Sequence, residues 1–88
     1  MRFTVIWVPT ATAELARLWT EASDRQAITD AANRIDRSLQ DDPESKTIPF
    51  GRFYALAAGP LAILCEIDPG DRMVRVIQVR EFDVNGKK

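Results

Sequence analysis

The second half of the chain contains two apolar runs separated by a turn signal. The runs, Leu61–Ile67 and Met73–Val79, are rich in β-branched residues, and Asp68-Pro69-Gly70-Asp71 lies between them. This pattern predicts an antiparallel β-hairpin. Leu61–Ile67 is apolar on both faces except at Glu66, so we expect a central strand with protein packed on each of its faces.

A short strand and a helix are predicted at the start of the chain. Phe3–Val8 is rich in β-branched and aromatic residues and stops at Pro9. Thr10 is the expected N-cap of a helix that ends near Ala22. Apolar residues recur through this helix at helical spacing, at Ala11, Leu15, Leu18 and Ala22. Trp19 lies beside this stripe, so we expect it in the core rather than as a platform for stacking on a base.

A second helix is predicted to follow almost at once. Ser23 and Gln26 match the capping-box pattern at its start. Asp42-Pro43 predicts its end, because proline disfavours helical geometry at the preceding residue. Its apolar stripe comprises Ile28, Ala31, Ala32, Ile35 and Leu39. Because so few residues separate the two helices, we expect an antiparallel helical hairpin.

The polar side of the second helix carries Arg34 and Arg37. Asp30 lies one turn before Arg34, in the order that favours an ion pair along a helix. We expect a solvated face with weak ion pairs, worth about 0.3 kcal/mol each, rather than a functional patch.

The remaining segments predict one more strand between polar connections. Glu44–Pro49 reads as a polar loop and Ala57–Pro60 as a turn. Between them, Phe50–Leu56 has the composition of a strand, in which Arg52 would share a face with Phe50, Tyr54 and Leu56. Residues 82–88 are expected to be a short strand end and a frayed tail.

The resulting order is strand, helix, helix, strand, strand, strand, which predicts an α+β fold. In this fold an N-terminal strand and a helical hairpin precede a three-stranded antiparallel meander, and all strands form one twisted sheet with the helices on one face. The first strand is expected beside the third or fourth. With 88 residues, the chain has room for a single domain, residues 1–88.

Charge and hydropathy narrow the partners and the location. The net charge of -1 combines -3 in residues 1–44 (five basic, eight acidic) with +2 in residues 45–88 (seven basic, five acidic). A nucleic-acid partner would therefore require a local cluster of arginines. No apolar run approaches the ~20 residues of a membrane span, so we expect a cytoplasmic protein without a membrane partner.

The chain contains no histidine and one cysteine, Cys65. This composition excludes a disulfide within the chain, a histidine-based acid and base pair, a Cys/His nucleophile and a typical structural zinc site. Cys65 lies among apolar residues, so we expect a buried small hydrophobe. No metal or cofactor is expected.

Several short sequences occur together in a characteristic order. The first strand ends at Trp7-x-Pro9, the helices contain AELARLW and RxAITxAAxRID, and Asp42-Pro43 follows. Arg52 then precedes Tyr54-x-Leu56, and the chain continues with PLAILCEID and VRVIQVR. Over essentially the whole chain, this order resembles the RelE/ParE superfamily of bacterial toxins.

The resemblance implies the toxin half of a type II toxin-antitoxin system, which arrests growth until a cognate antitoxin binds it. RelE-like members are mRNA interferases that cleave mRNA in the ribosomal A site, whereas ParE-like members inhibit DNA gyrase. The expected partners are therefore an antitoxin and either the ribosome with mRNA or gyrase. A third alternative is a degenerate member that only binds its antitoxin. A homodimer or a toxin-antitoxin hetero-oligomer, and a role in plasmid stabilization, are further implications.

The resemblance also suggests site residues, with three departures. The family's tyrosine or histidine after the last strand has no counterpart in Phe82-Asp83-Val84-Asn85, the family's final helix has no counterpart, and a basic residue is missing upstream. Where RelE-like nucleases carry a basic residue after the glycine that opens the central strand, this chain has Gly59-Pro60-Leu61. The matching positions elsewhere suggest Arg52, Arg80 and Glu81 as catalytic residues. The suggested RNA-binding residues are Lys46, Arg52, Arg75 and Arg80.

RNA cleavage through the 2′-hydroxyl requires a base, cationic groups for the charged phosphate and an acid for the leaving oxygen. The planar guanidinium suits the second role. Glu81 is the nearest candidate base and Glu66 another, although an exposed carboxylate ordinarily titrates near ~pH 4 and is a poor base. The alternative is that Arg52, Arg75 and Arg80 are solvated cations that discourage edge pairing, and Arg72 in the turn a solubilising residue.

Overall fold

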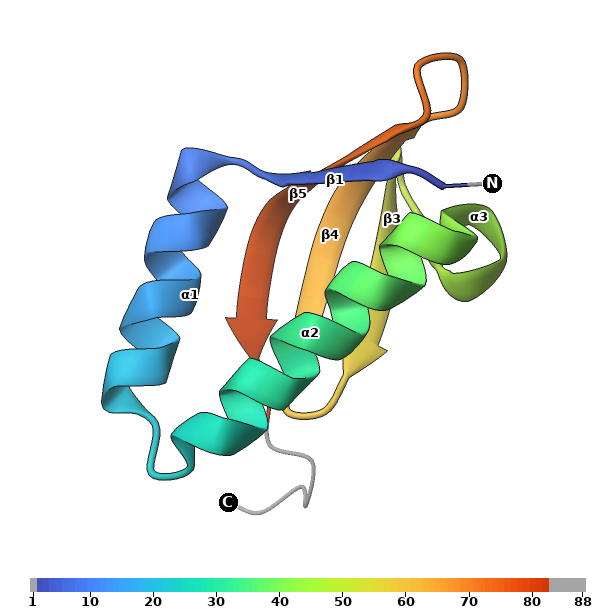
Figure 1. Cartoon of the computed structure of the whole chain (residues 1–88). Helices are drawn as coiled ribbons and strands as arrows, with labels where there is room; N and C mark the ends of the chain where they lie inside the picture. The colour runs from blue at the N-terminus through green and yellow to red at the C-terminus, as the bar shows by residue number, and fades with distance from the viewer. Residues whose placement is uncertain (1, 83–88) are drawn as a thin grey trace.

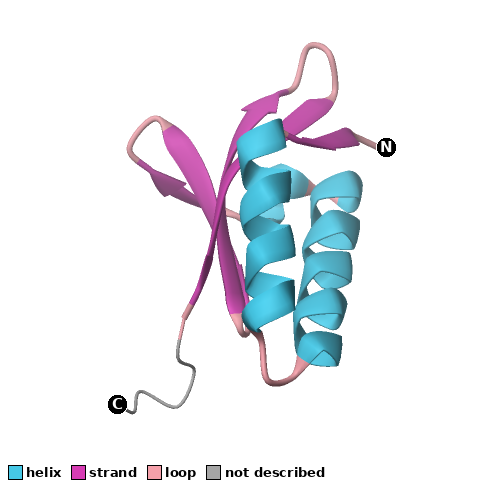
Figure 2. Cartoon of the chain, turned by 90° about the vertical axis from the view of Figure 1, so that its left-hand side faces the viewer, coloured by secondary structure: helices cyan, strands magenta, loops and turns pink. Residues whose placement is uncertain are grey.

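The computed structural model describes residues 2–82, which form a five-stranded sheet with two long helices on one face (Figures 1 and 2). The elements are β1 (Thr4–Trp7), α1 (Pro9–Glu21), α2 (Arg25–Asp41), α3 (Pro43–Lys46), β2 (Ile48–Phe50), β3 (Phe53–Ala58), β4 (Leu61–Asp68) and β5 (Met73–Glu81). The predicted α+β class, with helices on one face of one sheet, is confirmed. The predicted tail at residues 83–88 lies outside the described residues.

The strand order is β1-β5-β4-β3-β2, and β4 is the central strand. The predicted hairpin is confirmed as β4 and β5, which pair antiparallel from Leu61 opposite Glu81 to Asp68 opposite Met73. β1 lies parallel to β5, beside the last strand of the meander as expected. β1 thus forms one edge of the sheet, and the other four strands come from the C-terminal half of the chain.

The predicted helical hairpin is confirmed, but both predicted caps are wrong. α1 begins at Pro9, one residue before the predicted cap Thr10. Proline suits this position because its fixed φ is helical and its missing N–H would have no partner in the helix. α2 is capped by Asp24 rather than Ser23, and the Asp24 carboxylate accepts a hydrogen bond from the backbone N–H of Ala27 at 3.1 Å.

The segment from residue 44 to residue 58 differs most from the prediction. The expected polar loop contains the short helix α3, and the expected single strand is two strands, β2 and β3, that pair antiparallel. The chain reverses at Gly51-Arg52, where Gly51 has a φ of +64°. Glycine adopts this left-handed conformation without steric cost, so the turn forms inside an otherwise strand-like run. The meander therefore has four strands instead of three.

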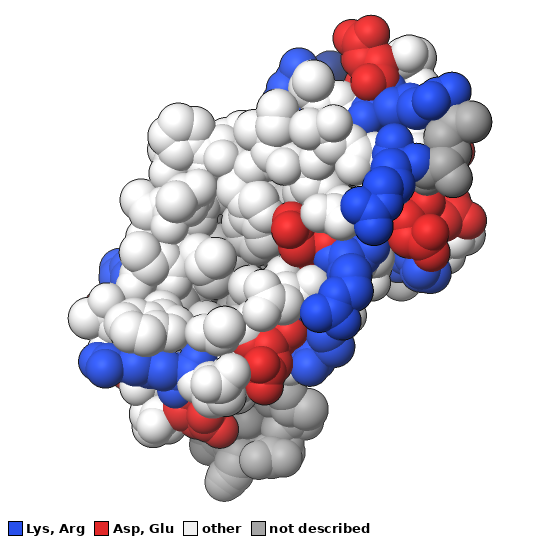
Figure 3. All heavy atoms as spheres, in the orientation of Figure 1, with Lys and Arg blue, Asp and Glu red and all other residues white. Residues whose placement is uncertain are grey.

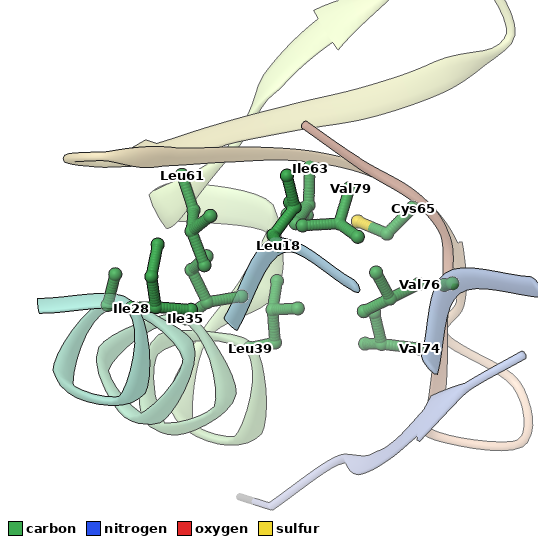
Figure 4. Packing of buried hydrophobic residues seen from close by; sticks show 12 residues of the cluster. Leu18, Ile28, Ile35, Leu39, Leu61, Ile63, Cys65, Val74, Val76 and Val79 are labelled. Carbon is green, nitrogen blue, oxygen red and sulfur yellow. The ribbon is translucent and has the colours of Figure 1, made fainter. Parts of the chain in front are cut away.

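The core lies between the two helices and the sheet (Figure 4). Its fully buried members include Ile28, Ile35 and Leu39 from α2 and Leu61 from β4. β4 and β5 add further apolar side chains from the same sheet face, namely Ile63, Cys65, Val74, Val76 and Val79. The predicted stripe of α2 is confirmed, and Cys65 is buried as expected.

The prediction that Trp19 lies in the core is wrong. Its side chain is 43% exposed, and its indole Nε1 donates to Thr29 Oγ1 at 3.2 Å. The Arg25 guanidinium lies over the ring, 4.6 Å from the ring centre. A cation over a tryptophan face is attracted by the ring quadrupole, so Trp19 links the two helices at the surface.

Two polar contacts join α2 to the sheet. The indole Nε1 of Trp7 in β1 donates to Asp36 Oδ1 at 3.2 Å. Arg34 Nη2 donates to the carbonyl of Gly59 in the β3–β4 turn at 2.8 Å. No ion pair between Arg34 and Asp30 is found among the described residues, because Arg34 reaches the sheet and Asp30 accepts from Gln26 instead.

The prediction that protein packs on both faces of β4 is wrong. Within residues 2–82, no element packs on the side of the sheet away from the helices (Figure 2). We call this side the open face. Its residues on β4 are Ala62 and Leu64, which are partly buried, and Glu66, which is exposed.

We predict that Ile35→Ala will destabilise the protein by about 2–5 kcal/mol, because Ile35 is fully buried and its truncation leaves a cavity between α2 and β4. Urea denaturation followed by circular dichroism measures the change. Ile48→Ala is the matched control, since Ile48 is 70% exposed, and we expect its cost to stay below about 1 kcal/mol. Equal losses in the two variants would contradict the assigned core.

Candidate functional site

The open face has an apolar centre. Ile48 and Phe50 of β2 are 70% and 61% exposed, and strand pairing places them on the same face as Ala55 and Leu64. Phe50, Ala55, Ala62 and Leu64 line a hollow of about 350 Å³. Sequence analysis missed this surface, because its signal, Ile48 and Phe50, was divided between a predicted loop and a predicted strand.

Arg75 and Arg80 of β5 both lie on the open face. Arg75 is opposite Glu66, and Arg80 is opposite Ala62. The two arginines are five positions apart, so strict alternation would place them on opposite faces. Ile77 is an extra residue in the pairing, because Leu64 is opposite Gln78 while the next residue, Cys65, is opposite Val76. This β-bulge brings both guanidiniums to one face.

Each of these arginines has a polar neighbour on the open face. Arg75 Nη1 lies 3.5 Å from Glu66 Oε1, and both side chains are 48% exposed. When the Gln78 amide is turned so that its oxygen faces Arg80, which satisfies both groups, the oxygen accepts from Arg80 Nη2 at 2.7 Å and from Nε at 2.9 Å. Gln78 thus orients Arg80 without neutralising it, whereas Glu66 compensates the charge of Arg75.

The other predicted site residues are not all on the open face. Arg52 lies exposed in the β2–β3 turn, two residues from Phe50. Glu81 is opposite the buried Leu61, so it belongs to the sheet face opposite to that of Arg80. Lys46 is in α3 and lies 3.6 Å from Asp41, beside the end of α2. The structure therefore brings together Arg75 and Arg80 but separates Glu81 and Lys46 from them.

A second hollow, of about 340 Å³, lies on the other side of Arg80, between α1 and β5. Glu14 of α1 lines it. Hydrogen bonding from Arg17 lowers the pKa of Glu14, and the charge of Arg80 acts in the same direction. A lowered pKa makes this carboxylate a weaker base. Glu14 therefore complements the charge near Arg80 but is poorly suited to remove a proton.

Three solved structures similar to this chain are a toxin-antitoxin complex and two structures of a toxin. The toxin-antitoxin complex RelBE2 from Mycobacterium tuberculosis matches with a TM-score of 0.77 and 19% identity, over 92% of this chain and 99% of that chain. This chain has the RelE-like fold. A double arginine-to-alanine mutant of E. coli RelE in the free state matches with a TM-score of 0.67 and 13% identity, over 98% and 88% of the two chains. The sequence itself matches no protein-family model and no curated protein.

A third structure, the isolated E. coli RelE toxin, matches with a TM-score of 0.63 and 12% identity, over 92% of this chain and 85% of that chain. All three similarities are below 25% identity, and they concern the fold. Their coverage of both chains indicates that the RelE-like fold accounts for the whole described domain rather than for one motif.

The RelE-like fold clarifies the departure at Gly59-Pro60-Leu61. Leu61 is fully buried and faces the helices, so an arginine at this position would be placed in the core. The neighbouring position on the open face is Ala62, which is opposite Arg80. A second cation beside Arg80 on the open face would have to be at position 62. The chain has the methyl group of Ala62 there instead.

The described residues contain no cluster of three or more His, Cys, Asp or Glu side chains that could hold a metal ion. Among residues 2–82, no helix has both the length and the apolar character of a membrane span. Arg75 and Arg80 can pair with anionic oxygens, and the apolar centre can receive a base or an apolar side chain. The open face is thus suited to binding, and its cations are suited to stabilising a charged phosphate.

Cys65 is suited to packing rather than to reaction. It is fully buried, and burial raises the pKa of its thiol to about 11. We predict that the folded protein will react slowly with iodoacetamide at pH 8, because the thiolate is the reactive form, and that urea unfolding will accelerate the reaction. Mass spectrometry of the alkylated product measures both rates, and equal rates would contradict the placement of Cys65.

The same pKa shift predicts a pH dependence of stability. The folded state holds the thiol proton more tightly than the unfolded chain, whose thiol titrates near ~8.5. The contribution of Cys65 is therefore complete below ~pH 8.5 and declines as the pH rises through about 11. Cys65→Ala should lack this part of the decline in urea denaturation.

Proposed function

We propose that this protein is the toxin of a bacterial type II toxin-antitoxin system, which acts in the cytoplasm until a cognate antitoxin neutralises it. The observation that carries the proposal is the RelE-like fold across the described residues, with 99% coverage of the matched chain of the RelBE2 toxin-antitoxin complex. The order of sequence motifs along the chain supports the same proposal independently.

We propose ribosome-dependent mRNA cleavage as the first candidate activity. Arg80 supports it, because Gln78 orients its guanidinium and no carboxylate is paired with it among the described residues. Arg75 and Arg52 are further cations for phosphate binding. Of the candidate bases, Glu66 is paired with Arg75 and Glu81 belongs to the opposite face of its strand. The reaction would therefore depend on the ribosome to position the substrate and on a group outside this chain to accept the proton of the 2′-hydroxyl.

Inhibition of a protein target such as DNA gyrase is the second candidate. The apolar centre of the open face favours it, because exposed aromatic and aliphatic side chains beside arginines are typical of protein-binding surfaces. Ile48 and Phe50 are the most exposed large apolar side chains in the described part of the chain. On this proposal, Arg80 is a docking residue instead of a catalytic one.

We predict that expression of the protein will arrest the growth of a bacterial host and that co-expression of the adjacent reading frame will restore growth. Arg80→Ala should weaken the arrest, with about a 100-fold loss of activity if Arg80 stabilises a transition-state charge. Arg72→Gln is the control, because Arg72 lies in the β4–β5 turn, away from the open face. Unaffected growth at confirmed soluble expression would contradict the toxin function.

The same cultures discriminate between the two targets. Mapping of mRNA 5′ ends after induction should show cuts positioned by codon if the protein is a ribosome-dependent nuclease. Intact mRNA with an SOS response would instead identify gyrase as the target. If antitoxin binding is retained without growth arrest, the chain is a degenerate member that keeps only the partner interaction.

A further inference from the structure

A separate basic hollow lies at the C-terminal end of α2. The backbone N–H of Phe3 donates to the carbonyl of Gln40 at 2.9 Å, which ties the segment before β1 to this end of α2. α3 begins directly after α2 and carries Lys46. The N-terminal segment and the consecutive helices α2 and α3 therefore contribute cations to one hollow of about 370 Å³, namely Arg2, Arg37 and Lys46.

The charges around this hollow are mostly positive and mostly uncompensated. Asp41 is the one carboxylate that lines it, and Asp41 lies 3.6 Å from Lys46 Nζ. Arg2 and Arg37 are exposed, and neither forms an ion pair within the described part of the chain. Ser38 and Gln40 add a hydroxyl and an amide to the lining. The hollow thus combines guanidinium, ammonium and neutral hydrogen-bond donors.

The position of the hollow at a helix C-terminus accounts for only part of this arrangement. A cation near that end of α2 is favourable, because the helix dipole places about half a negative charge there. A single cation would balance the negative charge of the helix dipole. Lys46 adds no excess positive charge, because Asp41 pairs with it. The positive charges of Arg2 and Arg37 together exceed the dipole charge, so the site retains an attraction for anions.

Figure 3 shows that Lys and Arg side chains form a band over α2 on the helical side of the molecule. Arg34, one turn before Ser38, lies on the same helix, and its guanidinium reaches the carbonyl of Gly59. The hollow therefore lies on the side of the sheet opposite to the open face. Sequence analysis assigned Lys46 to the site of Arg80, whereas the structure groups it with Arg2 and Arg37.

We propose that Arg2, Arg37 and Lys46 form a phosphate-binding site. Two guanidiniums can each present a planar pair of N–H donors to phosphate oxygens, and Lys46 adds a point charge. The phosphate belongs either to a nucleic-acid backbone, which the band along α2 could follow, or to a small free anion. This proposal does not depend on the toxin function, because binding is measured on the isolated protein.

The test is titration of the ¹⁵N-labelled full chain with inorganic phosphate and, separately, with a single-stranded RNA octamer. We expect the backbone amide signals of Arg37, Ser38 and Gln40 to shift. Arg37→Gln should weaken binding about ten-fold, equivalent to about 1.4 kcal/mol, since it removes a charged hydrogen-bond donor to the phosphate. Arg72→Gln removes an equal charge in the β4–β5 turn and should bind as the wild type does.

The outcomes separate the two sources of phosphate. Tighter binding of the RNA, with a salt dependence that decreases by about 0.7 in logarithmic slope in Arg37→Gln, identifies a nucleic-acid backbone. Equal binding of both probes identifies a small free anion. If neither probe shifts these amides, or if Arg72→Gln weakens binding as much as Arg37→Gln does, the proposal is wrong. Arg2→Gln is a second test variant, because Arg2 precedes every element of the fold.

Discussion

The structure depends on the packing of one face of the sheet against α1 and α2. Leu61 and Cys65 of β4 and Ile35 and Leu39 of α2 are fully buried. Burial of apolar side chains is the main source of stability in a chain of this size, and here the helices cover only one face of the sheet. The core residues are therefore confined to that face, and the opposite face is free to carry the side chains that bind.

The hydrophobic pattern predicted most of this architecture because long periodic stretches determine which faces are buried. The hairpin, the two helices and the α+β class were predicted correctly. The turn at Gly51-Arg52 was missed because it interrupts a run with the composition of a strand, and a single glycine was its signal. The cap of α1 was misplaced by two residues, since Val8 precedes the helix and Pro9 begins it, and the cap of α2 by one, since Asp24 takes the place of Ser23.

The candidate site was less predictable, because it depends on features without a clear sequence signal. Arg75 and Arg80 share a face only because Ile77 forms a bulge, which the pattern of apolar residues does not reveal. Lys46 belongs to a different hollow because α3 replaces the predicted loop. Sequence reasoning thus found the cations but could not sort them between the open face and the end of α2.

On the proposed function, the open face acts while the opposite face holds the fold together. The most direct test is the growth assay with Leu64→Asp, since Leu64 is on the open face opposite Gln78. A carboxylate there would repel a phosphate and also disrupt an apolar contact, so either mode of action should fail. The account predicts a soluble, folded variant that no longer arrests growth. Undiminished arrest at equal soluble expression would contradict it.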